Sequence, residues 1–362
     1  MENQDLPKVY QSGNVWQKKV YRHLAEYVKE KGVRNYGRSK GITRNGKSIE
    51  GSYYAHLLCE KDGFLNFISE SIFRKALKRF DEHKAGDKER ILSNTASSQA
   101  YCFNLFIFLD ENMELADELF SALLAKEVKV QHIIPEFTPG KNENLIGFEF
   151  DSEIIDETIG DQGPNRGTDA DVAVFYTDTN NQKGLILIEF KFIEAEFSVC
   201  TSYRTNQRNH PVCDSTLFYT HLVDNQAGPL KNGIRCGYKK YKNWPLTQAS
   251  QLLDIKIIQS LAGCPFKYGL NQLWRNILLA ERVSSARGCS EAHFWVFSPQ
   301  SNDPFLWKNG ETEKQLREIL TEKGTNAFRK IYLESVLEKI EILIAGKSMQ
   351  SEFREILRKY RV

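Results

Sequence analysis

The feature that most constrains the fold is a pair of apolar, β-branched runs near the middle of the chain. Val172–Tyr176 and Leu185–Ile188 are separated by a polar turn within the sequence GPNRGTDADVAVFYTDTNNQKGLILIEFKF, residues 163–192. Two short runs joined by a short turn predict an antiparallel strand pair. Their almost continuous apolar character is typical of strands that are buried on both faces.

Polar side chains stand at one end of this predicted hairpin. Asp171 precedes the first run, and Glu189 and Lys191 end the second. Because side chains alternate along a strand, Glu189 and Lys191 point the same way and Phe190 points the other way. Pairing of the two runs as a hairpin would bring Asp171 and Glu189 together. Two carboxylates and one amine are the composition of a site that holds a divalent metal and hydrolyses a phosphodiester.

The chemistry assigns a role to each of these groups. Mg²⁺ (or Mn²⁺) prefers hard oxygen ligands, so Asp171 and Glu189 are predicted as its ligands. Lys191 is expected to orient or deprotonate the attacking water, or to stabilise charge on the phosphate. Asp169 lies two residues before Asp171 and would share its face and the metal, and Glu149 is an alternative acidic neighbour on the preceding strand. The competing interpretation is a solvated sheet edge, but polar residues that follow a buried strand favour a cleft.

The remaining periodicity predicts helices around this hairpin. Helical spacing or apolar character covers Val15–Glu30, Phe64–Phe80, Ser97–Leu109, Leu115–Glu127 and Gln272–Val283, and the chain from Thr312 onward is charged with a helical period. Further strands are expected at Leu145–Phe150 and Ala292–Phe297. The order predicts an α/β fold with a mixed central sheet flanked by helices and with helical N- and C-terminal additions.

The chain is predicted to contain three regions, and its overall composition does not specify a function. We predict a basic, mostly helical region at 1–95, a catalytic core at 96–310 with a cysteine-containing insert at 194–266, and C-terminal helices at 311–362. The aromatic content of 12% argues against disorder, and the net charge of +2 does not by itself indicate a nucleic-acid binder.

A cytoplasmic location is expected from the sequence. No apolar run approaches the about 20 residues that a membrane span needs. The first residues, MENQDLPKVYQSG, are polar and lack the apolar core of a signal peptide. In that compartment the seven cysteines are expected to be thiols or metal ligands rather than disulfides.

A Gly-rich basic segment lies between the first two predicted helices. It is interpreted either as a solvated loop or as a contact to a phosphate backbone, since clustered cations gain from counterion release. The predicted DNA-binding residues are Arg34, Arg38, Lys40, Arg44 and Lys47.

The same segment contains a phosphate-loop pattern, and this raises an NTPase as an alternative function. Gly41–Ser48, GITRNGKS, satisfies G-x₄-G-K-[ST], with Leu105–Asp110 as the second acidic strand. Such a loop works only when a buried strand feeds it and a helix begins at the Lys-Ser. The preceding segment KEKGVRNYGRSK has no apolar run, so the pattern is not expected to form a nucleotide site.

At Asp171, Glu189 and Lys191 the chain resembles the PD-(D/E)XK nuclease superfamily, the restriction-endonuclease-like fold. Ala170 stands where that signature often has proline. The segments SSQAYCFNLF, GPNRGTDADVAVFY and CPFKYGLNQLWRNILLA are similar to a bacterial branch of these proteins, over roughly residues 95–300.

The resemblance implies further site residues and partners. It implies DNA as the substrate and a helical glutamine, a place that Gln272 fits, although Asn276 stands where a tyrosine is usual. A glutamate from the first core helix is also frequent, for which Glu118 is a candidate. Many double-strand cutters of this fold act as dimers, so a homodimer and a restriction or defence role are implied by analogy.

Four of the cysteines fall in the predicted insert. Cys200, Cys213, Cys236 and Cys264 would hold zinc or an iron–sulfur cluster, with His210 and His221 as substitute zinc ligands. Some nucleases of the superfamily carry such a cluster. The spacing has no C-x₂-C pair, and buried inert thiols are the alternative. Cys59, Cys102 and Cys289 are interpreted as ordinary core or surface residues.

One further alternative is a protein that has the nuclease fold but no catalytic activity. A nuclease fold can hold DNA without cutting it, as a binding module. The complete Asp–Glu–Lys set argues against this alternative, because carboxylates repel phosphate unless a cation bridges them.

Overall fold

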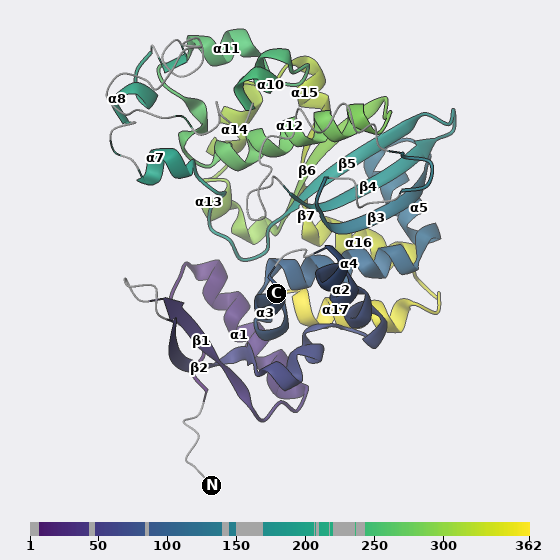
Figure 1. The fold of residues 1–362 in the computed structure, drawn as a ribbon. Coiled ribbons are helices and arrows are strands. Elements are labelled where there is room, and N and C mark those ends of the chain that lie inside the picture. Colours follow the sequence, from purple (N-terminus) through teal and green to yellow (C-terminus); the bar gives the residue numbers. More distant parts are fainter. Residues whose placement is uncertain are drawn as a thin grey trace.

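The computed structural model describes residues 7–42, 48–83, 87–139, 145–149, 169–205, 207, 210–216, 218–219, 236 and 243–362, apart from the side chains of residues 40–42, 48–50 and 83. Its centre is a five-stranded sheet with helices on both faces (Figure 1). The strands, in spatial order, are β3 (Val128–Phe137), β4 (Ala170–Asp178), β5 (Lys183–Phe190), β6 (Glu291–Ser298) and β7 (Phe328–Tyr332). The mixed, helix-flanked α/β fold predicted from the sequence is therefore confirmed.

The sheet combines antiparallel and parallel pairing. β3, β4 and β5 are antiparallel neighbours, whereas β5, β6 and β7 run parallel. The predicted hairpin is β4–β5, in which Val172 pairs with Ile188 and Thr177 with Lys183. This register places the start of β4 beside the end of β5.

Each face of the sheet has its own hydrophobic core. On one face, α4 (Ser98–Glu111), α5 (Met113–Leu124), α16 (Leu333–Leu343) and α17 (Gln350–Tyr360) pack over side chains such as Val172, Ile188 and Phe190. On the other face, α12 (Leu270–Ala286), α14 (Glu311–Glu318) and α15 (Glu322–Ala327) cover Ala173, Leu187 and Val296. Figure 1 shows these two layers below and above the sheet.

Helix α4 is the central helix of the first layer. Its residues Ala100–Leu109 are all buried, so the helix has no solvent-facing stripe. A helix that is apolar all round is stable only inside a core, and α4 lies between the sheet, α2 (Glu70–His83) and α17. The apolar run predicted at 97–109 is thus a buried helix.

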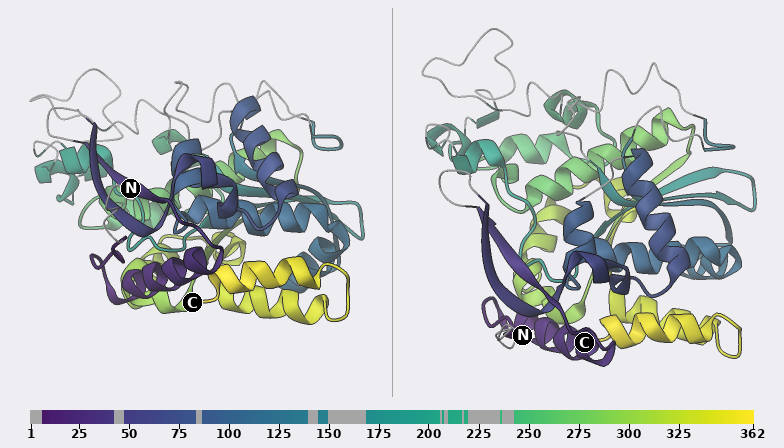
Figure 2. Two further views of the ribbon diagram at one scale, coloured as in Figure 1. Left: turned by 90° about the horizontal axis from the view of Figure 1, so that it is seen from below. Right: turned by 60° about the horizontal axis from the view of Figure 1, so that its bottom comes forward.

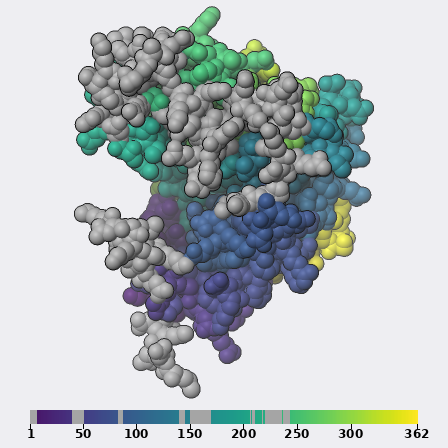
Figure 3. Space-filling model, viewed as in Figure 1, coloured from purple at the N-terminus to yellow at the C-terminus, as the bar shows by residue number. Residues whose placement is uncertain are grey.

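The N-terminal region packs onto this first layer. Helix α1 (Val15–Glu30) begins with a capping box, in which the Asn14 and Gln17 side chains each accept from the other residue's backbone N–H. Helices α1 and α17 lie side by side in both views of Figure 2, and Lys31 pairs with Glu355 at 2.5 Å. Seen as a surface, the N-terminal region and α2 form the lower part of one face and the helices around α12 the upper part (Figure 3).

Residues from all three predicted regions share one core. Trp16, Tyr101 and Tyr360 belong to the same hydrophobic cluster, and the rings of Tyr101 and Tyr360 stack with centroids 3.7 Å apart. The Trp16 Nε1–H also donates to the Phe192 carbonyl at 2.8 Å. The division at 95 and 310 stays a prediction, but the terminal regions support the sheet directly.

The remaining described elements are short. They are η1 (Glu60–Asn66), α3 (Lys88–Ser93), α7 (Thr201–Thr205), α8 (His210–Cys213), α10 (Asn243–Ala249), α11 (Ile255–Ser260), η4 (Pro265–Lys267), η5 (Gln300–Asn302) and α13 (Asp303–Leu306), where η denotes a 3-10 helix.

Three expectations about strands were wrong. The strand before the hairpin is Val128–Phe137, whereas the described part of the expected strand Leu145–Phe150, residues 145–149, contains no strand. The supposed basic loop contains an antiparallel pair, β1 (Tyr36–Ile42) and β2 (Ser48–Leu58). The charged C-terminal region contributes the fifth strand, β7, because its parallel pairing with β6 outweighs its polar sequence.

Candidate active site

The antiparallel pair β4–β5 brings the predicted carboxylates to one face and one end of the sheet. Asp171 precedes Val172 and Glu189 follows Ile188, so the two residues are opposite one another at the end of the ladder. The Asp171 Oδ2 accepts from the Phe190 backbone N–H at 2.6 Å. This contact fixes the Asp171 carboxylate across the end of β5, on the α12 side of the sheet.

Glu189 is held by three donors. Its Oε1 lies 2.7 Å from the Lys191 Nζ and accepts from the Gln272 Nε2 at 2.6 Å. Its Oε2 accepts from the Asn276 Nδ2 at 2.5 Å. The Glu189 side chain is only 3% exposed, so a charged carboxylate there requires these partners.

Helix α12 supplies two of these donors from one face. Gln272 and Asn276 are four residues apart and therefore project on the same side of the helix. The Gln272 Oε1 in turn accepts from the Ser198 N–H at 2.9 Å, which orients the amide. Asn276 was missed as a site residue because sequence reasoning compared it with an expected tyrosine. Its spacing from Gln272 was the signal that could have identified it.

A third buried carboxylate, Glu136, was not predicted. It lies on β3 between Pro135, which pairs with Val172, and Phe137, which pairs with Ala170, and so faces Asp171. Its φ of 50° is unusual for a residue with a side chain, and Arg79 donates to the carbonyls of residues 135 and 136. The Gln99 Nε2 donates to the Glu136 Oε1 at 2.8 Å.

The carboxylates of this group raise one another's pKa. Burial, followed by the charges of Glu189 and Glu136, raises the pKa of Asp171 well above its usual range. Burial, and then Asp169 and Glu189, raise the pKa of Glu136 to about 7. Carboxylates that destabilise one another in this way are stabilised by a bound cation.

Lys191 is paired with one carboxylate of this group, Glu189. Burial alone would lower the pKa of Lys191, but Glu189, Glu194 and Asp171 together raise it above its ordinary value. Lysine 191 is therefore held as an ammonium. Glu194 also accepts from the N–H groups of Phe192 and Ile193, at 3.0 and 3.2 Å. These bonds fix the turn that follows β5.

The residues fit a metal ion that keeps several waters. No three of the described His, Cys, Asp and Glu side chains already stand together closely enough to hold one ion. Mg²⁺ needs only one or two carboxylates and retains its remaining waters. Asp171 and Glu189 supply that number, and Glu136 adds negative charge beside them.

The other acidic residues considered from the sequence lie in different places. Asp169 is exposed, precedes β4 and accepts from the Thr138 side chain, and its charge is close enough to affect Glu136. The prediction of Glu149 as a metal ligand was wrong. Its side chain is fully exposed and accepts from the Gly147 N–H near Lys183, at the opposite end of β5. Glu118 pairs with Lys347 on the outer side of α5.

The described members of the predicted DNA-binding set lie on β1 or just before it. Arg34 is exposed before β1, and the Arg38 guanidinium lies 4.4 Å from the Tyr53 ring centre. Lys40 is on β1, while Arg44 and Lys47 lie outside the described residues. The hairpin is anchored near the site, because Thr95 beside α4 donates to the His56 carbonyl through both its N–H and its hydroxyl.

The nucleotide-binding alternative is wrong. Gly41 pairs with Ile49 and Ile42 with Ser48 in an antiparallel ladder, so Ser48 begins a strand where a phosphate loop requires a helix. The supposed acidic strand at 105–110 is the interior of helix α4.

The four insert cysteines line a common cavity, together with aromatic side chains. His210 lies on α8 and bonds the Tyr203 carbonyl, and His221 is outside the described residues. Of the other cysteines, Cys102 is buried below the site, where its thiol lies 3.5 Å from the Asp171 carbonyl.

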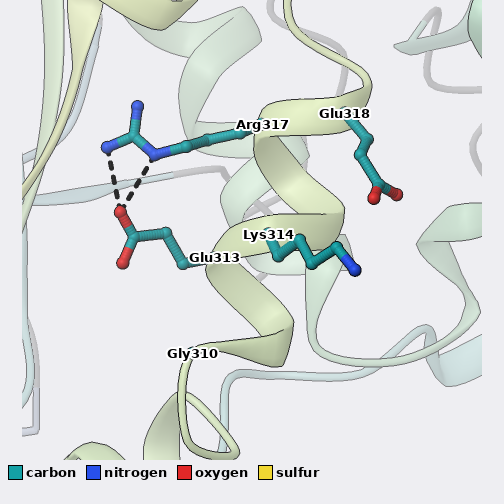
Figure 4. A pocket seen from close by; sticks show the side chains of 5 residues that line it. All are labelled: Gly310, Glu313, Lys314, Arg317 and Glu318. Carbon is teal, nitrogen blue, oxygen red and sulfur yellow. Dashed lines mark hydrogen bonds and ion pairs between the residues drawn. The ribbon is translucent and has the colours of Figure 1, made fainter.

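A larger hollow, of about 490 Å³, lies along α14 and is unrelated to these groups. Figure 4 shows that its polar side chains come from that helix alone, with Arg317 paired to Glu313 at 2.9 Å. The site is therefore identified by its chemistry rather than by the size of a cavity.

Together, the mixed sheet, the opposed Asp171 and Glu189, and the neighbouring Lys191 define a protein of the restriction-endonuclease-like class. The family model described as "Restriction Endonuclease associating with ARP" (REase-ARP) matches residues 29–360, and the chain belongs to this family. Comparisons with curated proteins and with solved structures found no match. Among the described residues, no helix has both the length and the apolar character needed to cross a membrane.

Proposed function

We propose that this chain is a divalent-metal-dependent nuclease that hydrolyses DNA phosphodiester bonds. The family supports a nuclease, and its description as a restriction endonuclease supports DNA as the substrate. The observation that carries the proposal is the convergence of Asp171 and Glu189 on one face, with Lys191 2.7 Å from Glu189. A restriction or defence role, a cytoplasmic location and a homodimer remain part of this proposal.

The mechanism assigns distinct tasks to the side chains. Asp171 and Glu189 would hold Mg²⁺ or Mn²⁺, which when bound activates water and stabilises the anionic transition state. Gln272 and Asn276 position the Glu189 carboxylate through their two hydrogen bonds. Neither amide titrates, so both donors persist at every working pH.

Lys191 acts as a cation in this proposal. Its ammonium is paired with Glu189, and a group held protonated cannot accept a proton from water. It therefore orients the attacking water or stabilises the charge that develops on the phosphate. Exposed Arg34 and Arg38 at the β1–β2 hairpin would contact the DNA backbone without reading bases.

DNA cleavage with Mg²⁺ or Mn²⁺ tests the proposal. We expect Lys191→Ala and Asp171→Ala to lower the rate at least about 100-fold, the usual effect of removing a group that acts in the transition state. Lys183→Ala is the matched control, because Lys183 is a lysine at the opposite end of the same strand. It should cleave like wild type.

The outcome also separates the enzyme from a DNA-binding module. If wild type binds DNA but cuts no faster than the Lys191→Ala and Asp171→Ala variants, the chain is a binding protein and the enzymatic proposal is wrong.

A further inference from the structure

The four insert cysteines line one cavity, away from the candidate active site. Cys200 precedes α7, Cys213 ends α8, Cys264 precedes η4, and Cys236 lies between α8 and α10. All four line an enclosed cavity of about 20 Å³. The cysteines are 13 or more residues apart in the sequence, so only the tertiary fold brings them together.

Backbone contacts join the loops that carry these cysteines. The Cys264 N–H donates to the Cys213 carbonyl at 2.7 Å, and the Cys200 N–H donates to the Lys267 carbonyl at 3.3 Å. A Cβ at Gly263 would lie 2.9 Å from the Cys213 carbonyl oxygen, so this close approach requires glycine. The cavity is therefore held by the backbone and does not depend on chance side-chain proximity.

The sulfur atoms also accept hydrogen bonds from fixed donors. The Tyr203 N–H lies 3.4 Å from the Cys200 Sγ, and the Trp244 indole N–H lies 3.4 Å from the Cys236 Sγ. The Phe266 N–H is directed at the Cys264 sulfur. A neutral thiol is a weak acceptor, whereas N–H donors to sulfur are a usual feature around metal-bound thiolates.

The cavity walls favour a closed site. Trp244, Phe266 and Trp274 line it, and the Phe266 and Trp274 rings stack with centroids 4.0 Å apart. Lys267 also lines the cavity, where its ammonium would offset thiolate charge.

We propose that Cys200, Cys213, Cys236 and Cys264 bind a single structural zinc ion. Four sulfur ligands in a closed, aromatic-walled site suit tetrahedral Zn²⁺. The volume of about 20 Å³ is close to that of one water molecule, so it fits one ion better than a four-iron cluster. The thiols do not yet stand at ligating separations, so binding would draw them inward by rotation about their Cα–Cβ bonds.

The ion would stabilise the segment around Ser198 and Cys200, which lies beside the candidate active site. Cys200 is two residues from Ser198, whose N–H orients Gln272, and Gln272 donates to Glu189. The zinc proposal does not depend on the nuclease proposal, because its readouts are metal content and thermal stability.

Elemental analysis of the purified full chain is the first test. We expect about one zinc ion per chain, lost in Cys200→Ser and in Cys264→Ser. Cys289→Ser is the matched control, because Cys289 lies outside the cavity, and it should retain the metal. Equal zinc in the Cys200→Ser and Cys289→Ser variants would overturn the proposal.

A second test uses wild type alone and does not depend on the folding of variants. Metal-stripped protein should take up one equivalent of Co²⁺ with the intense near-ultraviolet absorption of cobalt–thiolate bonds, and zinc should displace the cobalt and raise the melting temperature. Iron with acid-labile sulfide in the purified protein would instead identify a cluster and overturn zinc. Failure to bind either zinc or cobalt would mean that the cysteines are structural thiols.

Discussion

The raised pKa of Glu136 provides the sharpest quantitative prediction. Its carboxyl is buried and has a pKa of about 7 in the folded chain, against an ordinary 4.5. Between these two pH values the folded chain binds more protons than the unfolded chain, so stability falls as the pH rises through this window. The destabilisation is complete above pH 7 and amounts to about 3 kcal/mol, at about 1.36 kcal/mol per pH unit.

Glu136→Gln should remove this pH dependence. The amide oxygen still accepts from Gln99, but it carries no charge. The variant should therefore gain stability relative to wild type as the pH rises. Its unfolding free energy minus that of wild type should be about 3 kcal/mol larger at pH 8 than at pH 4.5. Comparing the two pH values cancels any constant cost of packing the new amide. For 362 residues this corresponds to a difference of about 4 °C in melting temperature.

The assay is urea or thermal unfolding in EDTA at both pH values. Glu118→Gln is the control, because Glu118 is a half-exposed glutamate outside the site, and it should show no such difference. Adding Mg²⁺ at pH 8 should reduce the stability difference between Glu136→Gln and wild type, because the cation offsets the negative charge of Glu136 in wild type. If the unfolding free energies of Glu136→Gln and wild type differ by the same amount at pH 4.5 and pH 8, the pKa of Glu136 is not raised in the folded chain and the reasoning fails.

Three further perturbations test other contacts. Asn276→Ala removes the amide that donates to the Oε2 of buried Glu189, and it should lower the unfolding free energy by about 1.5–3 kcal/mol in urea titrations. An unchanged unfolding free energy would show that water replaces the amide. Trp16→Phe keeps an aromatic ring but loses the donor to Phe192, so we expect a loss of about 1 kcal/mol in the same titrations, together with slower DNA cleavage. Lys359 is buried, and burial lowers its pKa. The unfolded chain therefore binds more protons at neutral and mildly alkaline pH, so the stability of wild type should rise with pH in that range. Lys359→Met should flatten this rise when unfolding is measured from pH 7 to 10.

The core of the candidate site was predictable because its pattern is local. Strand alternation and one short turn were sufficient to place Asp171, Glu189 and Lys191 together, since antiparallel pairing within a hairpin involves no distant segment. Gln272 was identified through a resemblance, and its contact with Glu189 links residues 83 positions apart. No periodicity could have predicted that contact.

The residues that were missed depend on non-local pairing. Glu136 lies on a strand whose sequence, VKVQHIIPEF, mixes charges with a proline and shows no clear alternation. That strand forms because β4 offers it an unpaired edge, and the Arg79 bonds stabilise its unusual end. The β1–β2 pair and β7 were missed for the same reason, as their glycine-rich or charged sequences become strands only beside a partner.

The stacking of Tyr101 on Tyr360 and the bond from Trp16 to Phe192 have a consequence for the timing of activity. During synthesis, the strand that carries Glu189 leaves the ribosome long before α17 exists. Helix α4, which supports the site from below, is covered by α17 only once residue 360 has been made. A nascent chain would therefore hold Asp171 and Glu189 on their paired strands before α17 packs against α4, so the full core around the site forms only when synthesis is nearly finished.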